Sequence, residues 1–191
     1  NNDWCPTQEQ FANTSATEQF FSGQGAMFFA GSWDLANLCS TYTDMNGKWD
    51  VAVLPKCPNP ESGDGRAVIS NSVSYATAAE GKNKDTAMDF LKFLASEEGQ
   101  RIQGESGVAI PAYNGLEDTW VNTFAENGYD IHPENIIPMF DYSVKYVNNP
   151  SRPSWEPKVE QAVLDIYAGN MSVDDGIQNM QDIVTEAIAE E

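Results

Sequence analysis

The stretch FFSGQGAMFFAGSWD, residues 20–34, decides how this sequence is interpreted. Its two phenylalanines close a helix that begins near Thr17, and Gly23 occupies the position that glycine favours after a helix. The apolar run 26–30 lies between two glycines, which is typical of a buried strand. The stretch therefore predicts a helix, a turn and a buried strand that leads directly into Ser32-Trp33-Asp34.

Two tryptophans are candidate ligand contacts. Trp33 follows the predicted strand, at a place where folds of strands and helices commonly contact ligands, and Trp155 directly precedes a predicted helix between two prolines. An indole ring beside carboxylates and amides suits a sugar, whose C–H face stacks on the ring while its hydroxyls take hydrogen bonds. Packing in the core or at a hinge is the other interpretation, and the residues alone leave both open. Packing is favoured for Trp4, Trp49 and Trp120.

Strands and helices alternate along the rest of the chain, so we predict the α/β class. Further strands are predicted at 49–54, 67–69 and 72–77, where β-branched and small residues gather. Residues 56–66 are predicted to form a surface loop, and residues 114–153 carry no clear pattern. An amphipathic helix is predicted after Asp85 as its N-cap, and a shorter one from Ser96 to Gln103.

Two strong helices close the chain. The first is predicted to begin at Pro157, a residue common at the first helical position, and to stop at Gly169. The second opens after Ser172 with a capping pattern in which Asp175 replaces the usual Glu. Their apolar residues recur at helical spacing. The buried faces are expected to be Val159, Ala162, Val163, Ile166 and Tyr167 in the first helix, and Ile177, Met180, Val184, Ala187 and Ile188 in the second.

Composition excludes several functions. The chain has 191 residues with 29 acidic and 10 basic side chains, a formal net charge of -19. Binding to nucleic acid needs cationic side chains that displace counterions from phosphates, so nucleic acid is excluded as a partner, and anionic lipid is disfavoured for the same reason. No run approaches 18 consecutive apolar residues, so no transmembrane helix is predicted.

Few residues support catalysis or metal binding. His132 is the single histidine and precedes a proline in a loop-like stretch, so we interpret it as an ordinary surface residue. Phosphate-loop, zinc-helix and nucleophile-elbow motifs are absent, and neither a metal nor a cofactor is expected. Three cysteines match no zinc or redox spacing. A Cys39–Cys57 disulfide and isolated thiols both remain open, with Cys5 left over.

The order of motifs resembles the family 1 extracellular solute-binding proteins, the maltose-binding protein-like receptors of ABC sugar importers. The resemblance rests on the stretch 20–33, the segment Trp49 to Pro55, and the segment Ala87 to Gln100. It continues in Ile110-Pro111-Ala112, which follows the second of the helices predicted there. The final helix pair, joined by Gly169-x-x-Ser172, completes it. The resemblance extends over nearly the whole chain.

The resemblance implies a type II periplasmic-binding-protein fold, of which this chain is the C-terminal portion. Residues 1–65 are expected to form the first part of the C-terminal lobe, residues 66–113 to return to the N-terminal lobe, and residues 114–191 to supply the closing helices. The middle segment would then lack most of its packing partners. A signal peptide and a lipid-modified cysteine would precede Asn1.

The resemblance also implies a binding site. Trp33 corresponds to the family's Gly-x-Trp aromatic that stacks on sugar, and Trp155 to a second stacking aromatic, although Pro157 departs from the family pattern there. Ser32, Asp34, Ser70 and Asn71 are further candidates for the cleft. No residue is expected to be catalytic.

The function implied is the substrate-binding component of an ABC transporter, which binds a sugar or oligosaccharide in a cleft between lobes and delivers it to the permease subunits. We expect a monomeric, extracellular lipoprotein, or a periplasmic protein in a Gram-negative organism. The alternative is a carbohydrate-active enzyme or carbohydrate-binding module. A ligand other than a sugar also remains open.

Overall fold

The computed structural model describes residues 6–59, 63–145 and 149–190. The chain divides into two compact units, one formed by residues 1–28 with 147–191 and the other by residues 29–146. We describe each unit by itself. These boundaries differ from the expected lobe boundaries, because residues 66–113 belong here to a larger unit that starts at Phe29. The lobe assignment itself stays a prediction.

Among its described residues, the first unit contains four helices, α1 (Gln8–Asn13), α2 (Ala16–Phe21), α7 (Arg152–Ala168) and α8 (Val173–Ala189). The predicted end of α2 is confirmed, with Gly23 in the left-handed conformation at φ 78°. The α7 helix ends at Gly169, which has φ 77°. The α8 helix begins directly after Ser172, whose hydroxyl accepts a hydrogen bond from the Asp175 backbone N–H at 3.1 Å. Both terminal signals were thus identified correctly from the sequence.

The α7 helix begins earlier than predicted, at Arg152 instead of Pro157. A bidentate pair joins the Arg152 guanidinium to the Glu156 carboxylate one turn later, at 3.0 and 2.7 Å, and supports this first turn. Pro157 consequently lies inside the helix. Since the extra turn contains Trp155, this residue belongs to the helix and does not precede it.

The α7 and α8 helices pack against each other through small residues. Ala162 is buried, and a Cβ added at the buried Gly176 would collide with the Ile166 side chain, so glycine permits this close approach. The predicted faces are only partly correct. Tyr167, Ile177 and Ile188 are exposed, while Ile166 packs against Gly176.

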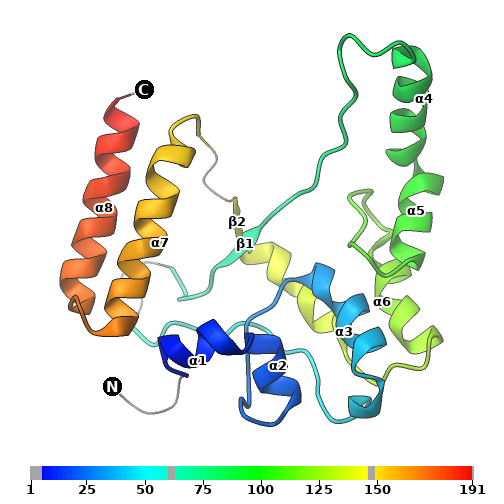
Figure 1. The fold of residues 1–191 in the computed structure, drawn as a ribbon. Helices are drawn as coiled ribbons and strands as arrows, with labels where there is room; N and C mark the ends of the chain where they lie inside the picture. The colour runs from blue at the N-terminus through cyan, green and yellow to red at the C-terminus, as the bar shows by residue number, and fades with distance from the viewer. Residues whose placement is uncertain (1–5, 60–62, 146–148, 191) are drawn as a thin grey trace. The chain divides into compact units, whose positions relative to one another are not determined.

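The remaining described elements all belong to the second unit, and its helices and strands are labelled in Figure 1. In chain order these are η1 (Ser32–Asp34), α3 (Leu35–Thr41), η2 (Thr43–Met45), β1 (Val68–Ser70), α4 (Lys84–Leu94), α5 (Glu97–Glu105), α6 (Glu117–Glu126), η3 (Pro133–Tyr142) and β2 (Ser143–Lys145).

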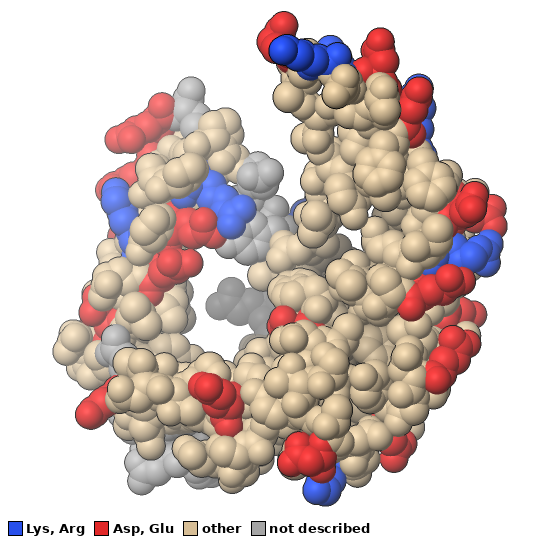
Figure 2. Space-filling view, turned by 45° about the vertical axis from the view of Figure 1, so that its right-hand side comes forward, with Lys and Arg blue, Asp and Glu red and all other residues tan. Residues whose placement is uncertain are grey.

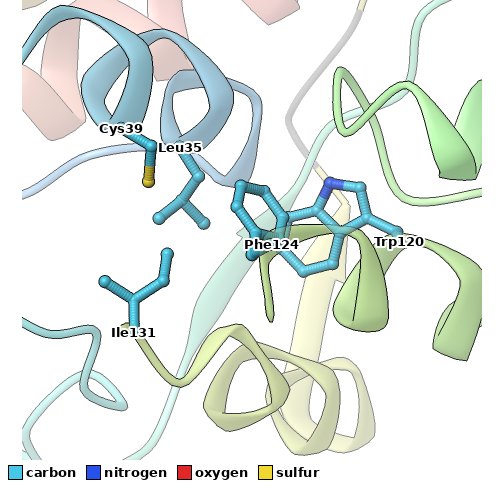
Figure 3. Packing of buried hydrophobic residues seen from close by; sticks show 5 residues of the cluster. All are labelled: Leu35, Cys39, Trp120, Phe124 and Ile131. Carbon is cyan, nitrogen blue, oxygen red and sulfur yellow. The ribbon is translucent and has the colours of Figure 1, made fainter. Parts of the chain in front are cut away.

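The core of this unit joins α3 to α6 and the following loop (Figure 3). Trp120 is fully buried and packs edge-to-face with Phe124 at a centroid distance of 5.2 Å. Its indole N–H donates to the Gly107 carbonyl at 3.0 Å, which satisfies the one polar group of the ring. The packing role expected for Trp120 is therefore confirmed. The buried cluster consists of Leu35, Cys39, Trp120, Phe124 and Ile131.

Strands were over-predicted. The described sheet has two strands, β1 and β2, paired in parallel with Ile69 opposite Val144. The predictions at 26–30, 49–54 and 72–77 were wrong: these segments lie outside regular strands, and Met27 and Phe29 are 88% and 81% exposed. The apolar composition suited a strand, but no partner strand lies beside these segments in the described chain. The described chain is mostly helical with one small sheet, so the predicted α/β class is confirmed only in part.

The α4 helix is amphipathic as predicted but has no buried residue, and its N-cap is Asn83 instead of Asp85. Phe90 is 59% exposed and stacks on Phe93 at a centroid distance of 6.4 Å. In the preceding extended segment, Val73 and Tyr75 are exposed as well. Several large apolar side chains exposed on consecutive elements are unusual for a stable monomer.

Both described cysteines are free thiols, so the Cys39–Cys57 disulfide is not formed. Burial raises the pKa of the Cys39 thiol to about 11, which keeps it protonated and unreactive at neutral pH. Cys5 and Trp4 lie outside the described residues.

Acidic side chains are spread over the visible face, and basic ones are few (Figure 2). Within the described chain, no helix is long and apolar enough to cross a membrane.

Candidate functional site

Trp33 is an exposed aromatic ring held against the backbone of its own turn. It lies on η1, and 57% of its surface is exposed. A Cβ added at Gly31 would collide with the six-membered part of the indole, so the ring lies against this glycine. The Gly-x-Trp pattern therefore has a local physical reason: glycine leaves the space that the ring occupies.

The turn that carries Trp33 is fixed to the core. The Asp34 backbone N–H donates to the Gly31 carbonyl at 3.0 Å, and the Leu35 N–H donates to the Ser32 carbonyl. Leu35 is the first residue of α3 and is buried in the cluster around Trp120. Because η1 continues directly into α3, the exposed ring stands on a well-packed support.

Polar residues precede and follow Trp33 in the chain. Ser32 and Asp34 are half-buried neighbours on the same turn. Neither side chain makes a hydrogen bond within the described chain, so the Ser32 hydroxyl and the Asp34 carboxylate are available to a ligand. An exposed aromatic ring, a hydroxyl and a carboxylate on one short turn are groups that a polyhydroxylated ligand can use.

Ser70 and Asn71 belong to the same unit but to a different element. Ser70 ends β1 opposite Lys145 and is half-buried, while Asn71 follows it and is exposed. Ser32, Trp33 and Asp34 are consecutive residues of η1, and in the described part of the chain no hydrogen bond joins Ser70 or Asn71 to them.

Trp155 differs from Trp33 in burial. It is only 7% exposed, and its indole N–H donates to the Asn149 side-chain oxygen at 3.1 Å. It belongs to the other unit, and its ring face is covered in this structure. The sequence signal that would have indicated burial is the helical spacing from Trp155 to Val159 and Ala162, which places the tryptophan on the inner face of α7.

Two hollows lie away from these residues. One of about 200 Å³ is formed around α1 and α2 by polar side chains, and one of about 180 Å³ is lined mainly by the ends of α5 and α6. Neither includes any of the six predicted site residues. Trp33 itself is exposed on the surface of the described chain.

The expected surface histidine has a partner that the sequence did not indicate. His132 Nδ1 lies 2.7 Å from Asp50 Oδ2, although the two residues are 82 positions apart. Among the described residues, no group of three or more His, Cys, Asp or Glu side chains is arranged to hold a metal ion. The turn Ser32–Asp34 offers a ligand hydrogen bonding and stacking.

Comparison with protein families gives a match over part of the chain. Residues 5–101, just over half of the chain, match the family described as bacterial extracellular solute-binding protein. The matched region includes Ser32–Asp34 with Ser70 and Asn71, and it ends before Trp155. No curated protein matches the chain.

Proposed function

The chain belongs to the bacterial extracellular solute-binding proteins, and from this premise we propose that it binds a sugar or oligosaccharide for an ABC transporter. Family membership itself means a solute-binding component of such a transporter, located outside the cytoplasmic membrane. The nature of the solute and its delivery to permease subunits are part of the proposal. Members of this family typically bind solutes without converting them chemically.

The observation that carries the proposal is the exposed ring of Trp33. More than half of this large side chain faces solvent, and the ring rests on Gly31. Ser32 and Asp34, its neighbours in the chain, carry a hydroxyl and a carboxylate. An exposed indole has no structural purpose comparable to that of the buried Trp120. Stacking on the C–H face of a sugar, with hydrogen bonds to flanking oxygens, uses all of these groups.

We propose secondary roles for the remaining candidates. Ser70 and Asn71 lie at the end of β1 and would contact the ligand from a second element. Trp155 would need its side chain to become more exposed before it could stack on a ligand, so we place it second to Trp33. The acidic side chains of the chain suit a neutral ligand, whose hydroxyls can donate to carboxylates.

We also propose that residues 66–113 pack against a further lobe of a longer receptor. The support is the apolar surface of α4 and of the segment before it, where Val73, Phe90 and Phe93 are exposed. Residues 1–65 and 114–191 would form the lobe that carries Trp33. Such a receptor would act as a monomer, be anchored outside the cell by a lipid or be periplasmic, and close about a hinge on its ligand.

The proposal is tested by titrating the full-length protein with a panel of neutral mono- and oligosaccharides while tryptophan fluorescence is recorded. We expect saturable binding to at least one member, lowered about tenfold or more in Trp33→Ala, because a stacked aromatic contributes on the order of 1–2 kcal/mol. Tyr167→Ala is the matched control, since Tyr167 is also exposed (68%) but lies at the end of α7. Equal losses in both variants would argue against a site at Trp33.

A chemical measurement distinguishes the proposed receptor from the alternative, an enzyme that acts on carbohydrate. Incubation of the selected oligosaccharide with the protein, followed by assay of reducing ends, should show no increase over buffer. A steady increase that depends on protein concentration would replace the binding function with a hydrolytic one.

A further inference from the structure

The single histidine of the chain connects two distant segments of the second unit. The Asp50 carboxylate accepts a hydrogen bond from the His132 backbone N–H through Oδ1 at 2.8 Å, and its Oδ2 lies 2.7 Å from His132 Nδ1. The same Oδ1 also accepts from the Val51 backbone N–H at 2.7 Å. One carboxylate thus holds both the backbone and the ring of His132.

Neighbouring amide side chains continue this connection. The Asn46 side chain donates to the Gly128 carbonyl at 2.9 Å and accepts from the Asp130 backbone N–H at 2.8 Å. The Asn135 side chain donates to the Val51 carbonyl at 2.8 Å. All of these bonds join segment 46–51 to segment 128–135. Among the side chains that form these bonds, only the imidazole of His132 has an ordinary pKa near neutrality.

The connected segments are anchored in the core that supports Trp33. Trp49 and Val51 flank Asp50 and pack against the buried cluster, and Ile131, the neighbour of His132, is one of its buried members. Leu35, the residue after η1, lies in the same cluster. The residues next to Asp50 and His132 thus belong to the same core as the residue that follows η1.

We propose that Asp50 and His132 form a pH-sensitive clamp, in which protonated His132 fastens segment 46–51 to segment 128–135 and deprotonation weakens the link. The charge on the imidazole converts an ordinary hydrogen bond into a charge-assisted one with the carboxylate. Since His132 is the only histidine, no other side chain of this type responds over the same pH range.

The charges around His132 favour its protonated form. The hydrogen bond from its ring to Asp50 raises the pKa of His132 above the ordinary 6.5, and so do the charge of Asp50 and those of Glu134 and Asp130, while burial lowers it. For Asp50, burial raises the pKa, but the hydrogen bonds from Val51 and His132 together with the imidazole charge lower it overall.

The direction of the pH effect follows from these shifts. A histidine with a raised pKa contributes stability that is fully present below about pH 6.5 and is lost as the pH rises through its value in the folded protein. A carboxyl with a lowered pKa contributes stability above about pH 3.9 that is lost as the pH falls further. The clamp is therefore complete in mildly acidic solution and weakens toward alkaline pH.

The test is an NMR titration of the imidazole C–H resonance, followed by unfolding in urea at pH 6.0 and pH 8.5. We expect a His132 pKa above 6.5 in the wild type and a lower value in Asp50→Asn. In His132→Asn, which keeps a neutral donor, the loss of stability relative to wild type should be larger at pH 6.0 than at pH 8.5.

Glu134→Gln is the matched control, because it removes one nearby negative charge that makes no hydrogen bond to the ring. It should lower the pKa of His132 less than Asp50→Asn does. The clamp is overturned if the two variants lower the pKa equally, if Asp50→Asn leaves it unchanged, or if the stability lost in His132→Asn is the same at both pH values. None of these measurements depends on the identity of the ligand.

Discussion

At the scale of single residues, the presentation of Trp33 depends on Gly31. This glycine has φ −94°, a conformation open to any residue, so its role is to leave space for the ring and not to permit an unusual backbone. We predict that Gly31→Ala displaces the indole and weakens ligand binding, while the free energy of unfolding changes little because the ring is mostly exposed. Fluorescence titration and urea unfolding of the variant check both parts.

Gly25→Ala is the control for this prediction, since a Cβ there would meet its nearest atoms at an ordinary 3.8 Å. It should leave binding unchanged. Wild-type affinity in Gly31→Ala would mean that the ring does not need its present position. A large loss of stability in the same variant would mean that Gly31 acts on the fold and not on the site.

At the scale of elements, the α5–α6 contact also depends on one small residue. A Cβ at Gly104 would collide with Thr119 of α6 and approach Pro111 Cγ to 2.9 Å. We predict that Gly104→Ala destabilises the chain by about 1–3 kcal/mol, the usual cost of overpacking, despite the better helix propensity of alanine. Urea unfolding monitored by circular dichroism measures this change.

The double variant Gly104→Ala/Thr119→Ala removes the oxygen that the added methyl would meet first. It should recover part of the stability lost in Gly104→Ala. If the double variant is less stable by the full sum of the two single changes, the two residues do not interact and the packing explanation fails.

The elements that the sequence predicted well are those whose signals are local. The end of α2 at Gly23, the cap of α8 at Ser172 and the stop of α7 at Gly169 depend on hydrogen bonds within a few residues. The strand at 67–69 was placed to within one residue of β1. Strands at 26–30 and 49–54 were wrong because strand formation needs a partner, which no local pattern specifies.

The features of the candidate site were likewise predictable only where they depend on local contacts. The exposure of Trp33 agrees with its place in a Gly-x-Trp turn, because one local contact fixes the ring. The burial of Trp155 and the pairing of His132 with Asp50 were not predicted. One depends on where α7 begins, and the other joins residues 82 positions apart. Helix α6, which holds the core residues Trp120 and Phe124, lay within the stretch 114–153 that carried no clear pattern.

At the scale of the whole molecule, the proposed lobe assignment makes a prediction about α4. Phe90→Ser should change the stability of this 191-residue chain little, since Phe90 is 59% exposed. If a further lobe covers α4, the same substitution should cost about 3 kcal/mol in the full-length protein, as for a buried aromatic. Thermal unfolding of both proteins with and without the substitution makes the comparison. A small effect in the full-length protein as well would leave α4 uncovered and contradict the assignment.

The central claim, that a sugar stacks on Trp33, is tested most directly by saturation-transfer NMR between the full-length protein and the sugar selected from the panel. Saturation of aromatic protons should reach the C–H protons of one sugar face in the wild type and in Trp33→Phe, which keeps a flat ring. The transfer should disappear in Trp33→Ala. Transfer of equal strength to the same protons in Trp33→Ala would contradict the claim.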